Sequence, residues 1–194
     1  MRILHSGKDD PEILALLDRR RLLLSDDEEK ARKVKEIVAG VEKSGDQALI
    51  DYSEAFDRVK MTQTELSVTP EEFKNAYQQV EEDFLSALRT AKENIFRFHQ
   101  RQNQNSWVSY EEDGVILGQR FTPLERVGLY APGGVGGSTP LISSVLMNAI
   151  PAVVAGVERI ALCTPPRPDK TIHPCLLVAA AEVGVTELYK VGGA

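Results

Sequence analysis

A glycine-rich stretch near the middle of the chain has the residue types of a loop that binds an anionic ligand. Residues 132–138 read Pro-Gly-Gly-Val-Gly-Gly-Ser, between an apolar strand-like run at 127–130 and an apolar helix-like run that begins near Leu141. Glycine lets the backbone approach a ligand closely, and the free amides and dipole of a following helix favour negative charge. A ligand-binding loop and a flexible surface loop both fit this pattern.

The loop matches neither of the two common phosphate-binding signatures. No lysine followed by serine or threonine closes it, which excludes the loop of nucleoside triphosphatases. Its glycines stand at positions 133, 134, 136 and 137, which is not the spacing of the dinucleotide fingerprint. The next predicted strand also ends in Cys163-Thr164, without an acidic residue to hold a ribose. The loop by itself therefore does not identify its ligand.

Other polar side chains near this loop allow two interpretations each. Tyr130 ends the predicted strand, where its ring either covers a nucleotide or simply packs. Ser143 and Ser144 begin the predicted helix, where they either cap it or contact an anionic ligand.

Histidines and cysteines show no catalytic or metal-binding pattern. None of the three histidines has a ligand partner three or four residues away; His99 fits a structural hydrogen bond and His173 a helix cap. Cys163 and Cys175 fit structural roles, because neither has a base nearby in the sequence. We therefore predict neither a catalytic residue nor a metal ligand among these 194 residues.

The first part of the chain is predicted to be mostly helical. Helices are expected over 11–23, 30–43 and from Asp46, and a strand-like piece over 65–68. Thr69-Pro70-Glu71-Glu72 is a strong helix start, because threonine can cap and glutamate stands three residues later. Further expected elements are a helix over 81–102, with an apolar stripe that includes Phe98, and a hairpin whose strands, 107–110 and 115–121, flank Glu-Glu-Asp-Gly.

The last part has the alternation of strands and helices that is typical of a parallel α/β sheet. Strands are predicted at 127–130, 159–164 and 187–191, and helices at 141–155 and 174–183, which end at Gly156 and Gly184. Because the strands are apolar runs, we expect helices on both faces of the sheet. The fold class is α/β: a helical N-terminal scaffold with a hairpin over 1–125, and the first βαβαβ half of a Rossmann-like sheet over 126–194.

Composition and charge exclude several classes of function. Apolar residues make up 42% of the chain and charged residues 27%, with a net charge of −6 and no basic stripe, which argues against nucleic-acid binding. No apolar run approaches the roughly 20 residues that span a bilayer, and the N-terminus lacks a signal-peptide pattern. Two cysteines make no disulfide framework, so we expect a cytoplasmic protein that binds no membrane.

Several segments together resemble the histidinol dehydrogenase family, and the resemblance covers the whole chain. They are RVGLYAPGG (126–134), SSVLMNAIPAVVAGV (143–157), LCTPP (162–166) and AAAEVGVTELYKVGGA (179–194), preceded by the GVILGQ hairpin (114–119). The resemblance implies oxidation of L-histidinol to L-histidine, the last step of histidine biosynthesis, with two successive hydride transfers to NAD. It also implies a zinc that grips the substrate, a glutamate–histidine pair for proton transfer, and a homodimer with shared sites.

The resemblance also implies where the cofactors are held. Tyr130 falls on the tyrosine that contacts NAD, with Pro132, Gly133 and Gly134 beside it in the VGLYxPGG motif. The zinc ligands and the glutamate–histidine pair belong to a later part of the family's sequence. The chain ends at Gly192-Gly193-Ala194, after a third strand, so we expect an incomplete sheet and a fragment that is inactive alone. The alternative is a non-catalytic dimerisation or binding module built on the same scaffold.

Overall fold

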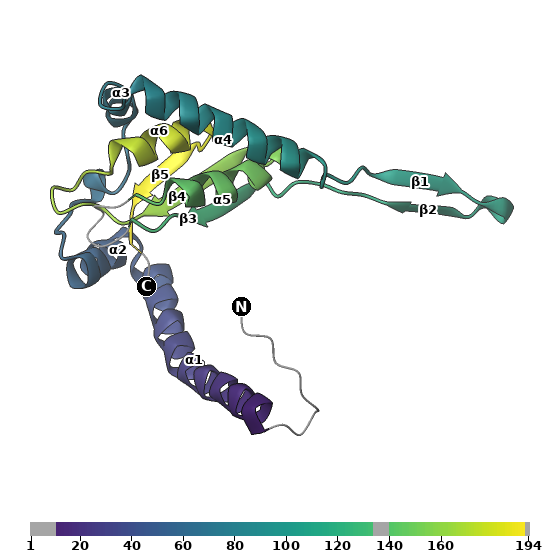
Figure 1. Ribbon diagram of the computed structural model, residues 1–194, viewed down its shortest axis with the longest axis horizontal. Helices are drawn as coiled ribbons and strands as arrows, with labels where there is room; N and C mark the ends of the chain where they lie inside the picture. Colours follow the sequence, from purple (N-terminus) through teal and green to yellow (C-terminus); the bar gives the residue numbers. More distant parts are fainter. Residues whose placement is uncertain (1–10, 134–139, 193–194) are drawn as a thin grey trace. The chain divides into compact units, whose positions relative to one another are not determined.

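A computed structural model describes residues 11–133 and 140–192, with side chains from residue 28 onward. The chain divides into two compact units, residues 1–48 and 49–193. The second unit contains the parallel sheet, the hairpin and every described candidate site residue (Figure 1). The α/β fold class predicted from the sequence is confirmed, whereas the domain boundary at 125/126 stays a prediction.

A single long helix, α1 (Pro11–Ser44), makes up most of the first unit. The sequence predicts two helices here, and the structure joins them. Residues 24–29, between the two predicted helices, contain neither glycine nor proline, so nothing in them stops the helix. The predicted stop at Gly45 is confirmed: its φ of +57° is left-handed, which glycine adopts without steric cost.

A short segment between helices α2 and α3 pairs with one edge of the parallel sheet. After α2 (Asp46–Tyr52), the strand-like piece predicted at 65–68 starts as a 3₁₀ turn (Gln63–Glu65) and then runs antiparallel to the last strand. The Val68 amide donates to the Leu188 carbonyl at 2.9 Å, and the Lys190 amide donates to the Leu66 carbonyl at 2.7 Å. This edge of the sheet is therefore paired along its last residues.

Helix α3 (Pro70–Tyr77) begins with the predicted capping box. The Glu72 amide donates to Thr69 Oγ1 at 3.3 Å, and the Thr69 amide donates to Glu72 Oε2 at 2.9 Å. Two backbone donors at the start of the helix are thus satisfied by side chains.

Helix α4 (Glu82–Gln100) confirms the long amphipathic helix of the sequence. Leu88 is buried, and most of the predicted stripe packs on the core, but Phe98 is 61% exposed. Phe98 lies in the last turn of α4, and periodicity alone places it wrongly in the core.

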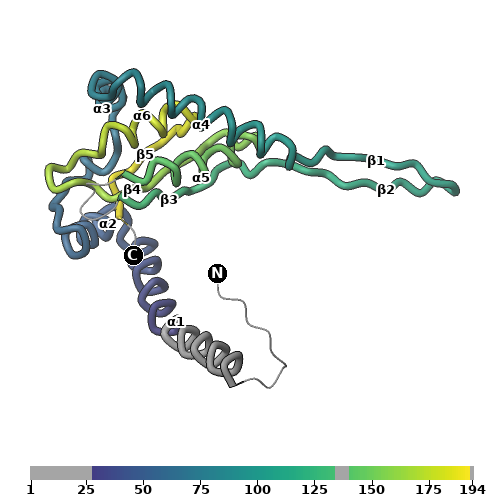
Figure 2. Tube along the Cα trace, viewed as in Figure 1, coloured from purple at the N-terminus to yellow at the C-terminus, as the bar shows by residue number. Residues whose placement is uncertain are grey.

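A two-stranded antiparallel hairpin follows, with β1 (Trp107–Tyr110) paired to β2 (Ile116–Gln119). The predicted aspartate–glycine turn is confirmed, because Asp113 and Gly114 both have positive φ. Figure 2 shows the two strands leaving the rest of the second unit side by side.

The parallel sheet has the order β3-β4-β5, so consecutive strands are neighbours. The strands are β3 (Arg126–Tyr130), β4 (Arg159–Thr164) and β5 (Glu187–Lys190). Helix α5 (Ile142–Val154) connects the first pair, and helix α6 (Pro174–Glu182) connects the second. These elements confirm the predicted βαβαβ order, and both helices end before glycines in left-handed conformation.

The core lies between the sheet and these two helices. Leu162 on β4 and Leu188 on β5 are buried against Val145 and Ile150 of α5 and Val178 of α6. Helices α3 and α4 pack outside α6 and α5 (Figure 1).

The other face of the sheet is more open than the sequence predicts. Arg126, Gly128 and Tyr130 all point to that face of β3, because residues two apart in a strand share a face, and all three are exposed. Right-handed crossovers between neighbouring strands place α5 and α6 on one side only, so apolar strands here do not mean that both faces are covered.

Candidate cofactor site

The strand and the helix on either side of the predicted glycine-rich turn are present as β3 and α5. The Ala131 amide donates to the Cys163 carbonyl at 3.0 Å, which is the last bond that holds this segment to β4. The chain then leaves the sheet at Pro132, and Gly133 is buried. Gly134 and the loop to residue 139 lie outside the described residues, so the structure brings Tyr130, Pro132 and Gly133 to one place and says nothing of Gly134.

Tyr130 presents its side chain to solvent while its backbone is fixed. The side chain is 41% exposed and lies on the open face of the sheet. Its carbonyl accepts a hydrogen bond of 3.1 Å from Nδ2 of Asn148, which ties the end of β3 to α5. Asn148 was missed by the sequence reasoning, although it is the one polar side chain in the apolar run 145–154.

Thr164 places a buried hydroxyl at the carboxyl end of β4. The residue is buried, and its Oγ1 has no hydrogen-bond partner among the described residues. An unpaired buried hydroxyl costs about 1–3 kcal/mol, so such a group is a candidate to bond a ligand or an ordered water. Thr164 lies on the helix-facing side of the sheet and Tyr130 on the open side. The two side chains are therefore on opposite faces of the sheet, each at the carboxyl end of its strand.

Among the described residues, no side chain caps the first turn of α5. Its N-cap residue is Leu141, which cannot accept a hydrogen bond through its side chain, and the Ser144 amide donates to the Leu141 carbonyl at 3.0 Å. Ser143 and Ser144 lie inside the helix, so the interpretation of either as the capping residue is wrong. Contact of these serines with an anionic ligand stays a prediction.

Lys190, at the carboxyl end of β5, forms an ion pair with Glu72. Its side chain is 7% exposed, and its Nζ donates to Glu72 Oε1 at 2.5 Å. Burial acts to raise the pKa of Glu72, but the hydrogen bonds from Lys190 and the Thr69 amide outweigh burial and hold this pKa below its ordinary value. Lys190 therefore holds α3 to β5 and is not free to bind an anion.

His173 and His99 have the structural roles predicted for them, and Cys163 and Cys175 are half-buried. His173 caps α6, because its Nδ1 accepts a hydrogen bond of 3.2 Å from the Cys175 amide, and His99 Nδ1 lies 2.7 Å from Gln102 Oε1. Burial raises the pKa of both thiols, Cys163 and Cys175, and so keeps them protonated at neutral pH.

Metal ligands are not gathered anywhere in residues 28–133 and 140–192. No three side chains of histidine, cysteine, aspartate or glutamate there come close enough to hold an ion. The described residues therefore do not fit a zinc centre. Within the same part of the chain, no helix is both long and apolar enough to cross a bilayer.

Comparisons with known proteins agree on one family. The histidinol dehydrogenase family profile matches residues 21–194. The histidinol dehydrogenase of Geobacillus kaustophilus is 50% identical over 175 residues, covering 90% of this chain and 40% of the relative. That of Nitratidesulfovibrio vulgaris is 48% identical over 161 residues, covering 83% of this chain and 37% of the relative.

A solved structure has the same fold over most of the chain. The crystal structure of histidinol dehydrogenase from Elizabethkingia anophelis superposes with a TM-score of 0.76 at 35% identity, covering 84% of this chain and 36% of that one. The chain thus spans about two fifths or less of the length of these relatives.

Proposed function

The chain belongs to the histidinol dehydrogenase family, and we propose that it contributes the NAD-binding part of an enzyme that oxidises L-histidinol to L-histidine in histidine biosynthesis. The family match across residues 21–194 carries this proposal. The strand, glycine turn and helix at 127–142 support it, because open α/β sheets bind their cofactors at the carboxyl ends of the strands.

Features of the β3 end fit NAD. Gly133 lets the backbone come close to a ligand, and the uncapped first turn of α5 offers amide donors and a positive dipole end for a pyrophosphate. The exposed ring of Tyr130 would cover a flat part of the cofactor. The buried hydroxyl of Thr164, which has no partner among the described residues, could donate a hydrogen bond to it. Bound NAD would supply the hydride acceptor.

Zinc and proton transfer are proposed to depend on residues other than these 194. The described residues do not gather three metal ligands, so no step of the reaction is assigned to a metal held by this chain. We propose that the working enzyme is a cytoplasmic homodimer in which this chain is one part of each subunit.

A chimera tests the proposed activity. Residues 1–194 are joined to the remainder of the Geobacillus kaustophilus relative, so that they replace the part that they match. We expect the purified chimera to reduce NAD when L-histidinol is added, and to lose this activity when a chelator removes zinc. The unmodified relative is the positive control, and the chain of 194 residues alone is expected to reduce no NAD.

The outcome separates the two functions that the sequence leaves open. If the chimera melts cooperatively at the temperature of the unmodified relative and yet reduces no NAD, the chain does not supply a working NAD site. The non-catalytic binding module is then the better description.

A further inference from the structure

One segment of the chain, residues 53–66, holds the backbone where it leaves β5. The Lys190 amide donates to the Leu66 carbonyl at 2.7 Å. The next residue, Val191, packs against a small buried apolar cluster of this segment, made of Val59, Met61 and Leu66. The residue after that, at position 192, also lies against the segment. Three consecutive residues at the carboxyl end of β5 therefore contact the same distant piece of chain.

Gly192 packs directly on the carboxyl group of Asp57. A Cβ at position 192 would lie 2.8 Å from Oδ1 and 2.9 Å from Cγ of Asp57, and closer still to Oδ2. These separations are shorter than side chains tolerate, and they involve the whole carboxyl group. Turning one oxygen away would not make room, so the entire side chain of Asp57 would have to move. Position 192 therefore accepts only glycine while Asp57 is in place.

A short π-helical turn, Ser53–Asp57, fixes the backbone that carries Asp57. Ser53 is 3% exposed, and its carbonyl accepts hydrogen bonds from the amides of Arg58 and Val59. Arg58 has a left-handed φ of +58°, which residues other than glycine seldom adopt. The turn is thus closed onto a buried residue, and Asp57 itself is half-buried. This burial raises the pKa of the Asp57 carboxyl group.

The strand register places Gly192 beside the proposed cofactor site. Tyr130 pairs with Cys163, and Cys163 pairs with Tyr189, so the two tyrosines lie at the same level of the sheet. Gly133 and Gly192 each stand three residues beyond them. Strands β3 and β5 are two interstrand spacings apart, about 10 Å. Because open α/β sheets bind ligands across the carboxyl ends of their strands, Gly192 borders the same edge as Gly133.

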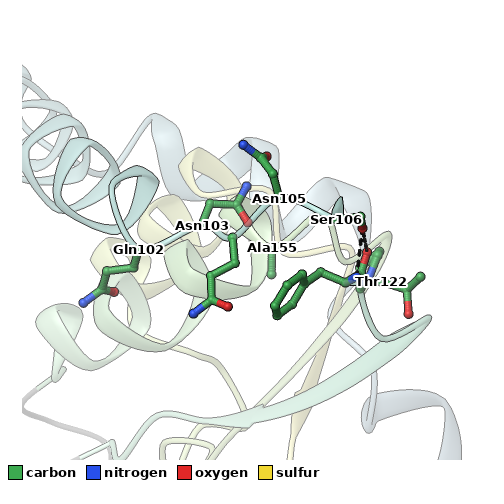
Figure 3. A pocket seen from close by; sticks show the side chains of 9 residues that line it. Gln102, Asn103, Asn105, Ser106, Thr122 and Ala155 are labelled. Atoms are coloured by element: carbon green, nitrogen blue, oxygen red, sulfur yellow. Dashed lines mark hydrogen bonds between the residues drawn. The ribbon is translucent and has the colours of Figure 1, made fainter. Parts of the chain in front are cut away.

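A pocket of about 510 Å³ lies at the opposite edge of the sheet (Figure 3). Its lining includes Thr122 and Pro123, which precede β3, and Ala155, which lies between α5 and β4. These residues come before the strands begin, so the pocket belongs to the amino ends of the strands. It does not shape the site at the carboxyl ends, where the path of the backbone leaving each strand matters instead.

We propose that Asp57 is a positioning residue of the cofactor site, which sets the path of the backbone beyond β5 through its contact with Gly192. This inference rests on the proposed NAD-binding function. Asp57 acts through the backbone and takes no part in hydride transfer. A side chain at position 192 displaces this backbone, and loss of the carboxyl group releases it. Either change misplaces the groups that this strand end offers to the cofactor, and misplacement by about 1 Å can cost up to 100-fold in activity.

Amide hydrogen exchange of the 194-residue chain, followed by NMR, tests the contact itself. Gly192→Ala and Asp57→Ala are each expected to speed exchange of the Lys190 amide by roughly fivefold or more, because both loosen the strand end. The double variant is expected to exchange no faster than the faster single variant, since the new Cβ no longer meets the carboxyl group. Glu54→Ala, which removes an exposed carboxylate of the same turn, is the matched control and is expected to change this rate less than about twofold.

Steady-state kinetics of the chimera tests the role in cofactor binding. Gly192→Ala and Asp57→Ala are each expected to raise the Michaelis constant for NAD by roughly fivefold or more, and the double variant by no more than the larger of the two. The Michaelis constant for L-histidinol is expected to stay within about twofold. Asp57→Asn, which keeps the shape of the side chain without its charge, is expected to keep the natural constant for NAD within about twofold. A purely structural role would instead lower the amount of folded enzyme and leave the constant for NAD unchanged.

Several results would overturn the inference. Unchanged exchange of the Lys190 amide in both single variants, or effects that simply add in the double variant, would show that Asp57 and Gly192 do not act through their contact. Faster exchange with an unchanged Michaelis constant for NAD would remove the role in cofactor binding, and an Asp57→Asn variant as impaired as Asp57→Ala would assign the effect to charge. A chimera with both natural residues that reduces no NAD would refute the proposed function and this inference with it, so the two failures are distinguishable.

Discussion

Replacing Glu72 by alanine is expected to lower the free energy of unfolding by about 4 kcal/mol. The substitution leaves the charge of Lys190 buried without its partner, which costs about 3–5 kcal/mol, and it removes one half of the capping box of α3. Urea unfolding followed by circular dichroism measures the change. Glu71→Ala, which removes an exposed neighbour in the same helical turn, is the control and is expected to change the stability by less than about 0.5 kcal/mol.

A double variant separates the stability that the ion pair contributes from the stability that the capping box contributes. If the buried charge dominates, Glu72→Ala combined with Lys190→Met regains roughly 2 kcal/mol or more, because methionine fills the space of the lysine stem without its charge. A loss of less than about 1 kcal/mol in Glu72→Ala, or no recovery in the double variant, would show that the pair between α3 and β5 is not what stabilises this part of the sheet.

Tyr130→Ala is expected to raise the Michaelis constant for NAD roughly tenfold in the chimera, equivalent to about 1.4 kcal/mol of lost cofactor binding. The ring is exposed at the end of β3, so the substitution removes a contact to the cofactor without leaving a cavity in the core. The Michaelis constant for L-histidinol is expected to stay within about twofold, as for a residue that binds cofactor only. Steady-state kinetics with each substrate varied in turn measures both constants.

Tyr130→Phe distinguishes the ring from the hydroxyl. If the ring covers the cofactor, this variant keeps the Michaelis constant for NAD within about twofold of the natural residue. Equal increases in both Michaelis constants for Tyr130→Ala, or an unchanged constant for NAD, would contradict the proposed contact.

Local signals in the sequence predict much of the fold. The capping box at Thr69 needs only residues three positions apart, and the stops at Gly45, Gly156 and Gly184 need only a left-handed residue after a helix. The strand–turn–helix around Tyr130 follows from a change in apolar periodicity that lies within one stretch of chain.

Features that depend on distant residues could not be predicted in the same way. The exposure of Phe98 depends on which residues the last turn of α4 packs against, and the pairing of Leu66–Val68 depends on β5, more than a hundred residues later. The pair between Glu72 and Lys190 and the unpaired hydroxyl of Thr164 likewise require the assembled sheet. Thr164 and Lys190 end β4 and β5, so part of the immediate surroundings of the candidate site is what the sequence leaves out.

NAD binding at the carboxyl end of β3 is tested most directly by hydrogen–deuterium exchange of the chimera with and without NAD. NAD is expected to slow exchange in peptides that cover residues 129–133 and the first turn of α5, and to leave exchange in the hairpin, residues 107–119, unchanged. Slowed exchange confined to other parts of the chain, with residues 129–133 unaffected at saturating NAD, would contradict it.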